Sequence, residues 1–506
     1  MQQASIALDP AFTIAPVSRR TFGSFVEHLG RCVYTGIYEP EHPTADPDGF
    51  RGDVLALTRE LGVSTVRYPG GNFVSGYRWE DGIGPRAERP VRRELAWHTT
   101  ETNEVGIDEF VAWCRRAGVE PMMAVNLGTR GVAEALDLLE YANHPDGTHL
   151  SQRRIAGGAV EPHDIRMWCL GNEMDGSWQI GNKNAVEYGR LAAQTARAMR
   201  MSDPDLELVV CGSSGAGMPT FGSWEAEVLT ETYDVVDYIS LHAYYEEHDG
   251  DLGSFLASTV DMERFIRSVV ATADHVGAKL KNHKRIQLSF DEWNVWYMSR
   301  ELNQGPRVGW PRAPRQLEDI YHVADAVVVG SMLICLLRNS DRVTAACQAQ
   351  LVNVIAPIMT EPGGPAWRQT IFHPFAQAST LARGEVLRVE PRVAAYETAR
   401  HGPAPLVDAV ATHDPESGDV TVFAVSRATT EPVTLRIDTH AFPGGLVPGD
   451  CTVLADPDVY AVNTAAEPDR VRPRPHPGVT AGDGAIEVVL PPVSWNVLRL
   501  QAPPAG

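Results

Sequence analysis

Basic residues, paired cysteines and long apolar segments are all scarce in this 506-residue chain. The 44 Lys and Arg are outnumbered by 65 Asp and Glu, which gives a formal net charge of −21. A field of that sign repels phosphate backbones and other polyanions at long range. The composition therefore argues against nucleic acid as a partner.

Cysteine is used sparingly and without a pattern. The seven cysteines are odd in number, widely scattered, and never spaced as C-x-x-C. A disulfide framework or a thiolate metal site needs paired or clustered thiols. We expect buried, reduced thiols of the kind found in cytoplasmic proteins.

No segment of the sequence predicts membrane insertion or export. The longest apolar stretch, 326–337, is too short to span a bilayer and is interrupted by Gly330 and Ser331. Residues 1–16 lack a basic region followed by an apolar run, so we expect no signal peptide. The predicted location is the cytoplasm, with no membrane contact.

Motifs for several other kinds of catalysis are missing as well. The segment Gly212 to Ala216 fails the G-x-S-x-G elbow because alanine stands at its last position. No glycine loop leads into Gly-Lys-Ser/Thr, none of the 16 histidines lies in H-E-x-x-H, and Glu27-His28 has no third ligand in register. We expect no phosphate-cradling loop, no metal and no cofactor.

Between residues 20 and 350, short apolar runs alternate with helical patterns such as 107–117, 185–199, 262–273 and 317–336. This alternation predicts a parallel sheet with crossover helices. The eight runs are Phe22–Glu27, Thr65–Tyr68, Pro121–Asn126, Arg166–Glu173, Leu206–Ser213, Tyr238–Tyr244, Ile286–Glu292 and Arg342–Gln348. Eight such units predict an α/β fold, a (β/α)8 TIM barrel.

The length of the chain favours two domains, because a single core stops growing well below 506 residues. After about residue 383 the pattern changes to period-2 strands such as Val433–Asp438, separated by Pro, Gly and Asp turns. These features predict a C-terminal all-β sandwich, jelly-roll-like in type. We place the catalytic barrel at 15–383 and the sandwich at 384–506 together with 1–14, where residues 4–14 read as one strand.

Two apolar runs end on a glutamate, Glu173 and Glu292, which lie 292 − 173 = 119 residues apart. They end the fourth and seventh predicted strands, and the active sites of such barrels lie at the C-terminal ends of the strands. One carboxylic acid and one carboxylate are what a retaining glycoside hydrolase requires. The two glutamates are therefore the predicted catalytic pair.

Each of these residues, taken alone, also has an alternative interpretation. Asn172-Glu173 alone would also suit a helix N-terminus, and His242 alone could be a core histidine. The second glutamate, and the aromatic residues that follow both Glu292 and His242, favour a catalytic cleft. Within it, Asn172 could bind the hydroxyl next to the anomeric carbon, while His242 and Tyr244 could donate to a nucleophilic carboxylate at Glu292.

Several long motifs support a specific relationship. They are Phe25–Arg31, Arg67–Phe73, Asn126–Thr129, Trp168–Gly176, Asp291–Trp296 and Ala349–Pro357. In these motifs, which are spread over nearly the whole chain, the sequence resembles the α-L-arabinofuranosidases of glycoside hydrolase family 51. The resemblance implies that Glu173 is the general acid/base and Glu292 the nucleophile.

The resemblance also implies a set of sugar ligands. These are Glu27, Asn72, Asn172, Tyr244 and Gln350, with His242 and Tyr244 supporting the nucleophile. Trp97 and Trp178 could offer flat faces to sugar rings, although ordinary packing would explain each of them equally well. Glu27 could instead be a buried partner of Arg31 or Arg67, and the connection 72–106, rich in Trp, Arg and Gly, is long enough to form a wall of the cleft.

We expect a retaining, exo-acting α-L-arabinofuranosidase that removes terminal groups from arabinan or arabinoxylan oligosaccharides. The alternatives are an endo-β-glucanase or β-xylosidase of the same clan, and a non-catalytic sugar-binding protein. The resemblance further implies a homohexamer. Linkage preference (1,2, 1,3 or 1,5) and the preferred aglycone stay open at this point.

Overall fold

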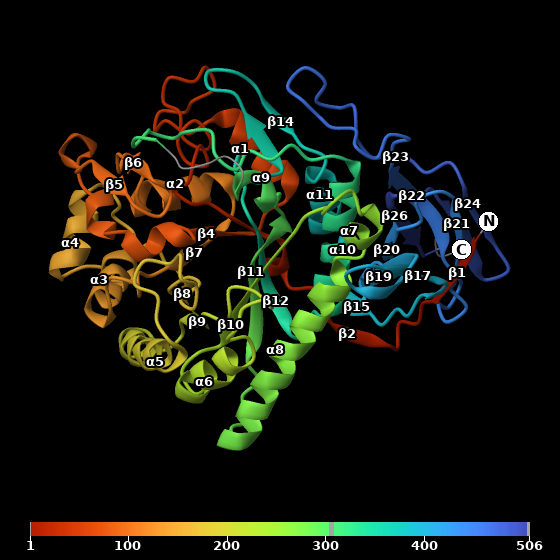
Figure 1. The fold of residues 1–506 in the computed structure, drawn as a ribbon, viewed down its shortest axis with the longest axis horizontal. Helices are drawn as coiled ribbons and strands as arrows, with labels where there is room; N and C mark the ends of the chain where they lie inside the picture. The colour runs from red at the N-terminus through yellow and green to blue at the C-terminus, as the bar shows by residue number, and fades with distance from the viewer. Residues whose placement is uncertain (1, 303–307, 503–506) are drawn as a thin grey trace.

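Eight parallel strands form a closed barrel, as the sequence predicts (Figure 1). The structure is a computed structural model that describes residues 2–302 and 308–502. The barrel strands are β3 (Gly23–Phe25), β4 (Thr65–Tyr68), β7 (Glu120–Ala124), β8 (Met167–Leu170), β9 (Glu207–Val210), β10 (Tyr238–Tyr245), β11 (Gln287–Val295) and β12 (Val343–Gln348). Their order around the barrel is β10-β11-β12-β3-β4-β7-β8-β9. Each predicted run overlaps one strand, which confirms the fold class.

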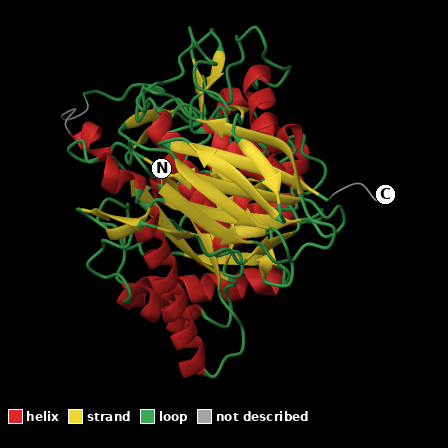
Figure 2. Cartoon of the chain, turned by 90° about the vertical axis from the view of Figure 1, so that its right-hand side faces the viewer, coloured by secondary structure: helices red, strands yellow, loops and turns green. Residues whose placement is uncertain are grey.

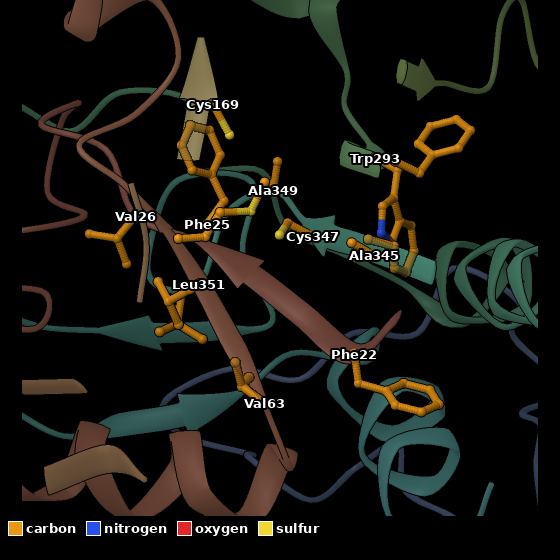
Figure 3. Packing of buried hydrophobic residues seen from close by; sticks show 14 of the residues in the cluster. Phe22, Phe25, Val26, Val63, Cys169, Trp293, Ala345, Cys347, Ala349 and Leu351 are labelled. Atoms are coloured by element: carbon orange, nitrogen blue, oxygen red, sulfur yellow. The ribbon is translucent and has the colours of Figure 1, made fainter. Parts of the chain in front are cut away.

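Helices alternate with the barrel strands along the chain. They are α1 (Gly52–Leu61), α2 (Ile107–Ala117), α3 (Val132–Asn143), α4 (His149–Ala156), α5 (Ala185–Ser202), α6 (Ser223–Thr232), α7 (Leu252–Leu256), α8 (Thr259–Leu280), α9 (Met298–Leu302), α10 (Val323–Arg338) and α11 (Phe372–Leu381). In α2, the residues Ile107, Phe110, Val111 and Cys114 are buried, at the spacing of one helix face. The core of the barrel continues into these helices, and Figure 3 shows Phe25, Ala345 and Cys347 among its buried side chains.

The C-terminal strands form the predicted sandwich, which faces the viewer in Figure 2. In order of pairing, the five-stranded sheet contains β16 (Arg392–Val393), β1 (Gln2–Ala7), β21 (Val433–Asp438), β25 (Ala485–Leu490) and β24 (Val479–Gly482). The seven-stranded sheet contains β2 (Thr13–Pro16), β15 (Glu385–Leu387), β19 (Val407–His413), β20 (Val420–Ser426), β26 (Ser494–Gln501), β22 (Val447–Leu454) and β23 (Arg474–Pro475). A second apolar core, which includes Ile6, Val422, Leu435 and Leu498, lies within this domain.

The N-terminal segment differs from the single strand expected over 4–14. It forms two strands, β1 and β2, which join different sheets of the sandwich. A turn separates them, in which the backbone N–H of Ala11 donates to the Asp9 carboxylate at 2.8 Å. The segment contributes to the sandwich as expected, and the exact boundaries 1–14, 15–383 and 384–506 stay a prediction.

Helix α10 occupies the space between barrel and sandwich. All residues from Val323 to Leu337 are buried, because this helix contacts β11 and β12 on one side and β19, β20 and β26 on the other. A helix that is apolar all round suits such a place. The predicted helical pattern at 317–336 begins too early, since the Asp325 carboxylate accepts the His322 backbone N–H at 2.7 Å and starts the helix at Val323.

The connection 72–106 is ordered by short elements. These are the 3-10 helices η2 (Asn72–Gly76), η3 (Trp79–Gly82) and η4 (Arg86–Glu88) and the hairpin of β5 (Arg92–Glu94) and β6 (Thr99–Glu101). A cavity of about 310 Å³ is lined by Phe73, Tyr77 and Glu94 of this segment together with Thr129 and Ile180. The remaining short elements are η1 (Arg19–Phe22) and the hairpins β13 (Ile358–Thr360) with β14 (Ala366–Arg368) and β17 (Ala395–Thr398) with β18 (Gly402–Pro405).

All seven cysteines are free thiols, and six of them are buried, as expected. Cys451 is partly exposed. Within the described residues, no helix is both long and apolar enough to cross a bilayer.

Candidate active site

The predicted site residues meet at the C-terminal ends of the barrel strands, where barrel enzymes carry their active sites. Glu27 follows β3, Glu173 follows β8, and Gln350 follows β12. His242 and Tyr244 belong to β10, and Glu292 belongs to β11. Strand pairing places His242 directly beside Glu292 and Tyr244 beside Asn294.

Glu292 is buried and is held by two donors. Its Oε1 accepts from Nη1 of Arg67 at 2.8 Å, and its Oε2 accepts from the hydroxyl of Tyr244 at 2.7 Å. One oxygen of the carboxylate thus meets a guanidinium and the other a hydroxyl donor. The predicted support of Glu292 by Tyr244 is present in this geometry.

Glu173 lies on the turn that follows β8, between the positive-φ residue Gly171 and the loop 174–183. Glu173 itself has φ = 43°, in the left-handed region that few non-glycine residues adopt. Its Oε1 accepts from Nδ1 of His242 at 2.8 Å, and its Oε2 accepts from the indole Nε1 of Trp178 at 2.7 Å. A strained backbone therefore aims this carboxylate at two N–H donors.

His242 is the cation between the two glutamates. The sequence predicts that it donates to Glu292, but its Nδ1 lies 3.6 Å from Oε2 of Glu292 and only 2.8 Å from Oε1 of Glu173. Its Nε2 donates to Oδ1 of Asp291 at 2.9 Å. Burial alone would lower the pKa of His242, but the carboxylates of Glu292, Asp291 and Glu173 together raise it to about 10. The imidazole is therefore doubly protonated at neutral pH.

Arg67 and Asp291 are central to the site, although the sequence motifs do not by themselves assign them a role. Arg67 donates to Glu292 and, through Nη2, to Oδ1 of Asn172 at 2.6 Å. Its Nε lies 3.9 Å from Oδ2 of the fully buried Asp291. A charged residue within an apolar barrel strand was the available signal, because a buried charge requires a partner.

Glu27 pairs with neither Arg31 nor Arg67, which contradicts that alternative. Arg31 binds Glu318 instead. The Oε1 of Glu27 accepts from the Phe73 backbone N–H at 2.9 Å and from the Trp97 indole at 2.8 Å, and its Oε2 accepts from Gln350 at 3.1 Å. Burial, with a smaller contribution from nearby Glu292, raises the pKa of Glu27 to about 8, against the opposing effect of these donors.

Two polar atoms in the site are available for a ligand. Nδ2 of Asn172 and Oε1 of Gln350 are buried, and neither has a hydrogen-bond partner among the described residues. Gly71 leaves room beside them. A Cβ there would lie 3.2 Å from Oε1 of Glu292 and 3.5 Å from Nδ2 of Asn172. Buried, unpaired donors and acceptors around such a space suit the hydroxyl groups of a sugar.

The remaining predicted residues lie at the rim of the site. Asn72 is half-buried and begins η2, directly after Gly71. Trp97, which extends from the β5–β6 hairpin, donates to Glu27, and Trp178 donates to Glu173 while its side chain is 50% exposed. Both tryptophans therefore do more than pack, since each binds a carboxylate through its indole N–H.

The three ligand-type atoms of Glu173, His242 and Glu292 lie within 4.8 Å of one another. Within the described residues, this is the group whose spacing would suit a metal ion. Both ring nitrogens of His242 bind carboxylates, Nδ1 that of Glu173 and Nε2 that of Asp291, so His242 serves here as a hydrogen-bonding group between them. The arrangement suits two-carboxylate chemistry.

Comparison with known proteins identifies the family. The model of the α-L-arabinofuranosidase 1 domain matches residues 57–262, and that of the α-L-arabinofuranosidase C-terminal domain matches residues 291–494. An intracellular exo-α-(1→5)-L-arabinofuranosidase of Streptomyces lividans is 61% identical over 100% of this chain and 76% of its own length. An exo-α-(1→6)-L-arabinofuranosidase of Bifidobacterium longum is 53% identical over 99% of this chain and 98% of its own.

A solved structure agrees with these matches. A family 51 α-L-arabinofuranosidase from Bifidobacterium longum, 50% identical, superposes with a TM-score of 0.95 and covers 99% of this chain and 100% of its own. The resemblance in the sequence motifs is thereby confirmed over the full length. The chain belongs to glycoside hydrolase family 51, the α-L-arabinofuranosidases.

Proposed function

We propose that this exo-acting α-L-arabinofuranosidase releases terminal α-L-arabinofuranosyl groups by double displacement, with retention of configuration. Glu292 attacks the anomeric carbon while Glu173 protonates the departing oxygen. The resulting arabinosyl-enzyme ester is then hydrolysed by a water molecule from which Glu173 removes a proton. The products are arabinose and the shortened chain.

The spacing of the two carboxylates carries this proposal. An oxygen of Glu173 and an oxygen of Glu292 lie within 4.8 Å of each other. Retaining glycosidases separate their carboxyl groups by about 5–5.5 Å, whereas inverting enzymes need about 6.5–9.5 Å to admit a water molecule. The observed spacing lies below the range of inverting enzymes, so it supports direct attack by a carboxylate.

The contacts of each glutamate support the assignment of roles. Arg67 and Tyr244 donate to the two oxygens of Glu292 and hold this carboxylate in place, as a nucleophile requires. Glu173 sits on a loop after its strand, near the half-exposed Trp178, where a leaving group can approach from solvent. We assign Glu27, Asn72, Asn172, Tyr244 and Gln350 to the furanose ring, and the unpaired atoms of Asn172 and Gln350 support this.

Replacement of each glutamate tests the roles. Glu292→Ala should abolish turnover, and added azide should restore a product of inverted configuration. Glu173→Ala should slow substrates with poor leaving groups most and spare activated aryl arabinofuranosides. Wild-type activity in either variant would disprove the assignment, and an inverted product from the wild-type enzyme, followed by NMR, would disprove retention.

The substrates we propose are arabinan and arabinoxylan oligosaccharides. The relatives named above are described as acting on (1→5) and (1→6) linkages, so relationship alone leaves the preferred linkage open. A panel of nitrophenyl glycosides and linkage-defined arabino-oligosaccharides tests both ring form and linkage. Release from the arabinofuranoside but not from the xyloside or glucoside is expected, and the reverse would favour the β-xylosidase or endo-β-glucanase alternative.

We also infer a cytoplasmic location and a homohexameric assembly. Relatives named intracellular and the seven free thiols support the former. The homohexamer is inferred from the family resemblance. Light scattering that showed a monomer would disprove this inference.

A further inference from the structure

Both carboxylate oxygens of Glu173 are bound by N–H donors. His242 donates to Oε1 at 2.8 Å, and the indole of Trp178 donates to Oε2 at 2.7 Å. A carboxylate that accepts at both oxygens is favoured in its ionised form. A general acid must instead carry a proton on the oxygen that faces the leaving group. The N–H donor on that oxygen therefore competes with the leaving group for the same position.

His242 is not the donor that can leave. Its ring is 2% exposed, and its second nitrogen is fixed to Asp291 at 2.9 Å. Trp178, in contrast, is half exposed and lies on the loop 174–183, five residues after the carboxylate that it binds. The exposed indole is therefore the donor that can leave.

The loop leaves space for this indole beside Gly176. A Cβ on Gly176 would lie only 2.5 Å from Cε2 and 2.6 Å from Cζ2 of Trp178. Real Cβ atoms essentially never approach so closely, so glycine at 176 is what allows the indole to fold over Glu173. The backbone N–H of Gly176 also donates to the Glu173 carbonyl at 2.9 Å, which fixes the start of the turn.

We propose that Trp178 is a positioning residue that occupies Oε2 of Glu173 in the free enzyme and is displaced from Oε2 by the glycosidic oxygen of the substrate. The proposal rests on the role of Glu173 as acid/base. When the indole leaves, Oε2 takes a proton from solvent. That proton passes to the glycosidic oxygen as its bond to the anomeric carbon breaks and the Glu292 carboxylate forms the ester bond.

The second half of the reaction restores the starting state. Glu173, now ionised, takes a proton from the attacking water, whose oxygen replaces Glu292 at the anomeric carbon. That proton returns to solvent when the indole rebinds Oε2. Substrate binding thus couples the hydrogen bond between Trp178 and Glu173 to the charge of the acid/base.

The variant Trp178→Phe removes the N–H donor and keeps an aromatic ring, and pH profiles of the full-length enzyme then test the coupling. The basic limb of kcat/KM reports groups of the free enzyme, and that of kcat reports the substrate complex. We expect the kcat/KM limb to move to higher pH, because a hydrogen-bond donor to the carboxylate is lost. The kcat limb should stay in place, since the indole has already left.

Two further variants sharpen the test. Gly176→Ala keeps the indole N–H of Trp178 but fills the space that the indole occupies beside residue 176. This variant should therefore shift the kcat/KM limb in the same direction as Trp178→Phe. Trp224→Phe is the matched control, because its indole donates at 3.0 Å to the Cys211 carbonyl and not to Glu173, and it should shift neither limb.

An unmoved kcat/KM limb in Trp178→Phe, or equal shifts of both limbs, would overturn the proposal. Failure of the underlying function would look different. If Glu173→Ala retained wild-type rates on unactivated substrates, the acid/base assignment itself would fall. If that variant lost those rates while Trp178→Phe kept its profile, only the role of Trp178 would be wrong.

Discussion

Nε2 of His242 lies 2.9 Å from Oδ1 of Asp291, and both side chains are almost completely buried. Burial alone would raise the pKa of Asp291, but Arg67 and His242 hold it below its usual range. Each group thus stabilises the charge of the other. This pair fixes the orientation of the imidazolium. Asp291 binds Nε2 of the ring, whereas Glu173 binds Nδ1 on its other side.

Asp291→Asn should lower the thermal unfolding midpoint, and the loss of stability at alkaline pH should begin at a lower pH. The pKa of His242 is raised to about 10, so its stabilising contribution is complete below about pH 6.5 and is lost as pH rises through about 10. Without the Asp291 charge, we expect that loss to begin one or more pH units lower, since an opposite charge at this range shifts a pKa by about 1–3 units. Thermal unfolding midpoints between pH 6 and 10 measure the effect.

The same variant leaves Arg67 with less buried negative charge near it. We expect the free energy of unfolding to fall by about 3 kcal/mol at pH 7, the usual scale for breaking a buried ion pair. A pH dependence identical to that of the wild type would show that Asp291 does not maintain the charge of His242.

Arg67→Lys should reduce catalysis far more than stability. A lysine keeps the charge but loses the planar fork that joins Glu292 to Asn172. Loss of one oriented donor at a reacting group costs about 100-fold, so kcat/KM should fall by about that factor. Steady-state kinetics on a nitrophenyl arabinofuranoside provide the measurement.

Arg31→Lys is the matched control for Arg67→Lys. Arg31 is also buried and also forms a two-pronged pair, with Glu318 at 2.6 and 3.0 Å. It should lose a similar amount of stability while keeping kcat/KM within about threefold. Equal losses of activity in both variants would mean that Arg67 has no special role.

Much of the architecture could be predicted from the sequence because the signals are local. Eight apolar runs gave the barrel strands, and glutamates at the ends of two runs gave the catalytic pair. The contacts between side chains could not be predicted, since they depend on how distant strand ends meet. That Trp178 binds Glu173, and that Arg67 links Glu292 with Asn172, required the three-dimensional arrangement. The split of residues 2–16 between two sheets follows from partners at least 385 − 16 = 369 residues away.

Gly71→Ala should impair substrate binding. The added Cβ would lie 3.2 Å from Oε1 of Glu292, 3.4 Å from Oε2 of Glu27 and 3.5 Å from Nδ2 of Asn172, in the space we assign to the furanose. Overpacking of a fitted site costs about 1–3 kcal/mol, so KM and the inhibition constant of arabinose should rise about tenfold or more. Gly217→Ala, where a Cβ would meet nothing within 4 Å, should leave both constants unchanged. An unchanged inhibition constant for arabinose in Gly71→Ala would show that the sugar does not bind in this space.

Gly330→Ala should destabilise the junction of barrel and sandwich without altering the site. Alanine in place of glycine gains about 1 kcal/mol in helix propensity. However, the new Cβ would lie 2.4 Å from Cε3 of Trp495, whose indole is buried and bound to Gln377 at 2.8 Å. Because that ring cannot move freely, overpacking at the upper end of about 1–3 kcal/mol outweighs the gain, and the thermal unfolding midpoint should fall while kcat stays constant. Its neighbour offers a control of opposite sign: the Ser331 hydroxyl is buried and lacks a partner among the described residues, so Ser331→Ala should leave the midpoint unchanged or raise it. A higher midpoint in Gly330→Ala would show that propensity, and not contact with Trp495, governs this position.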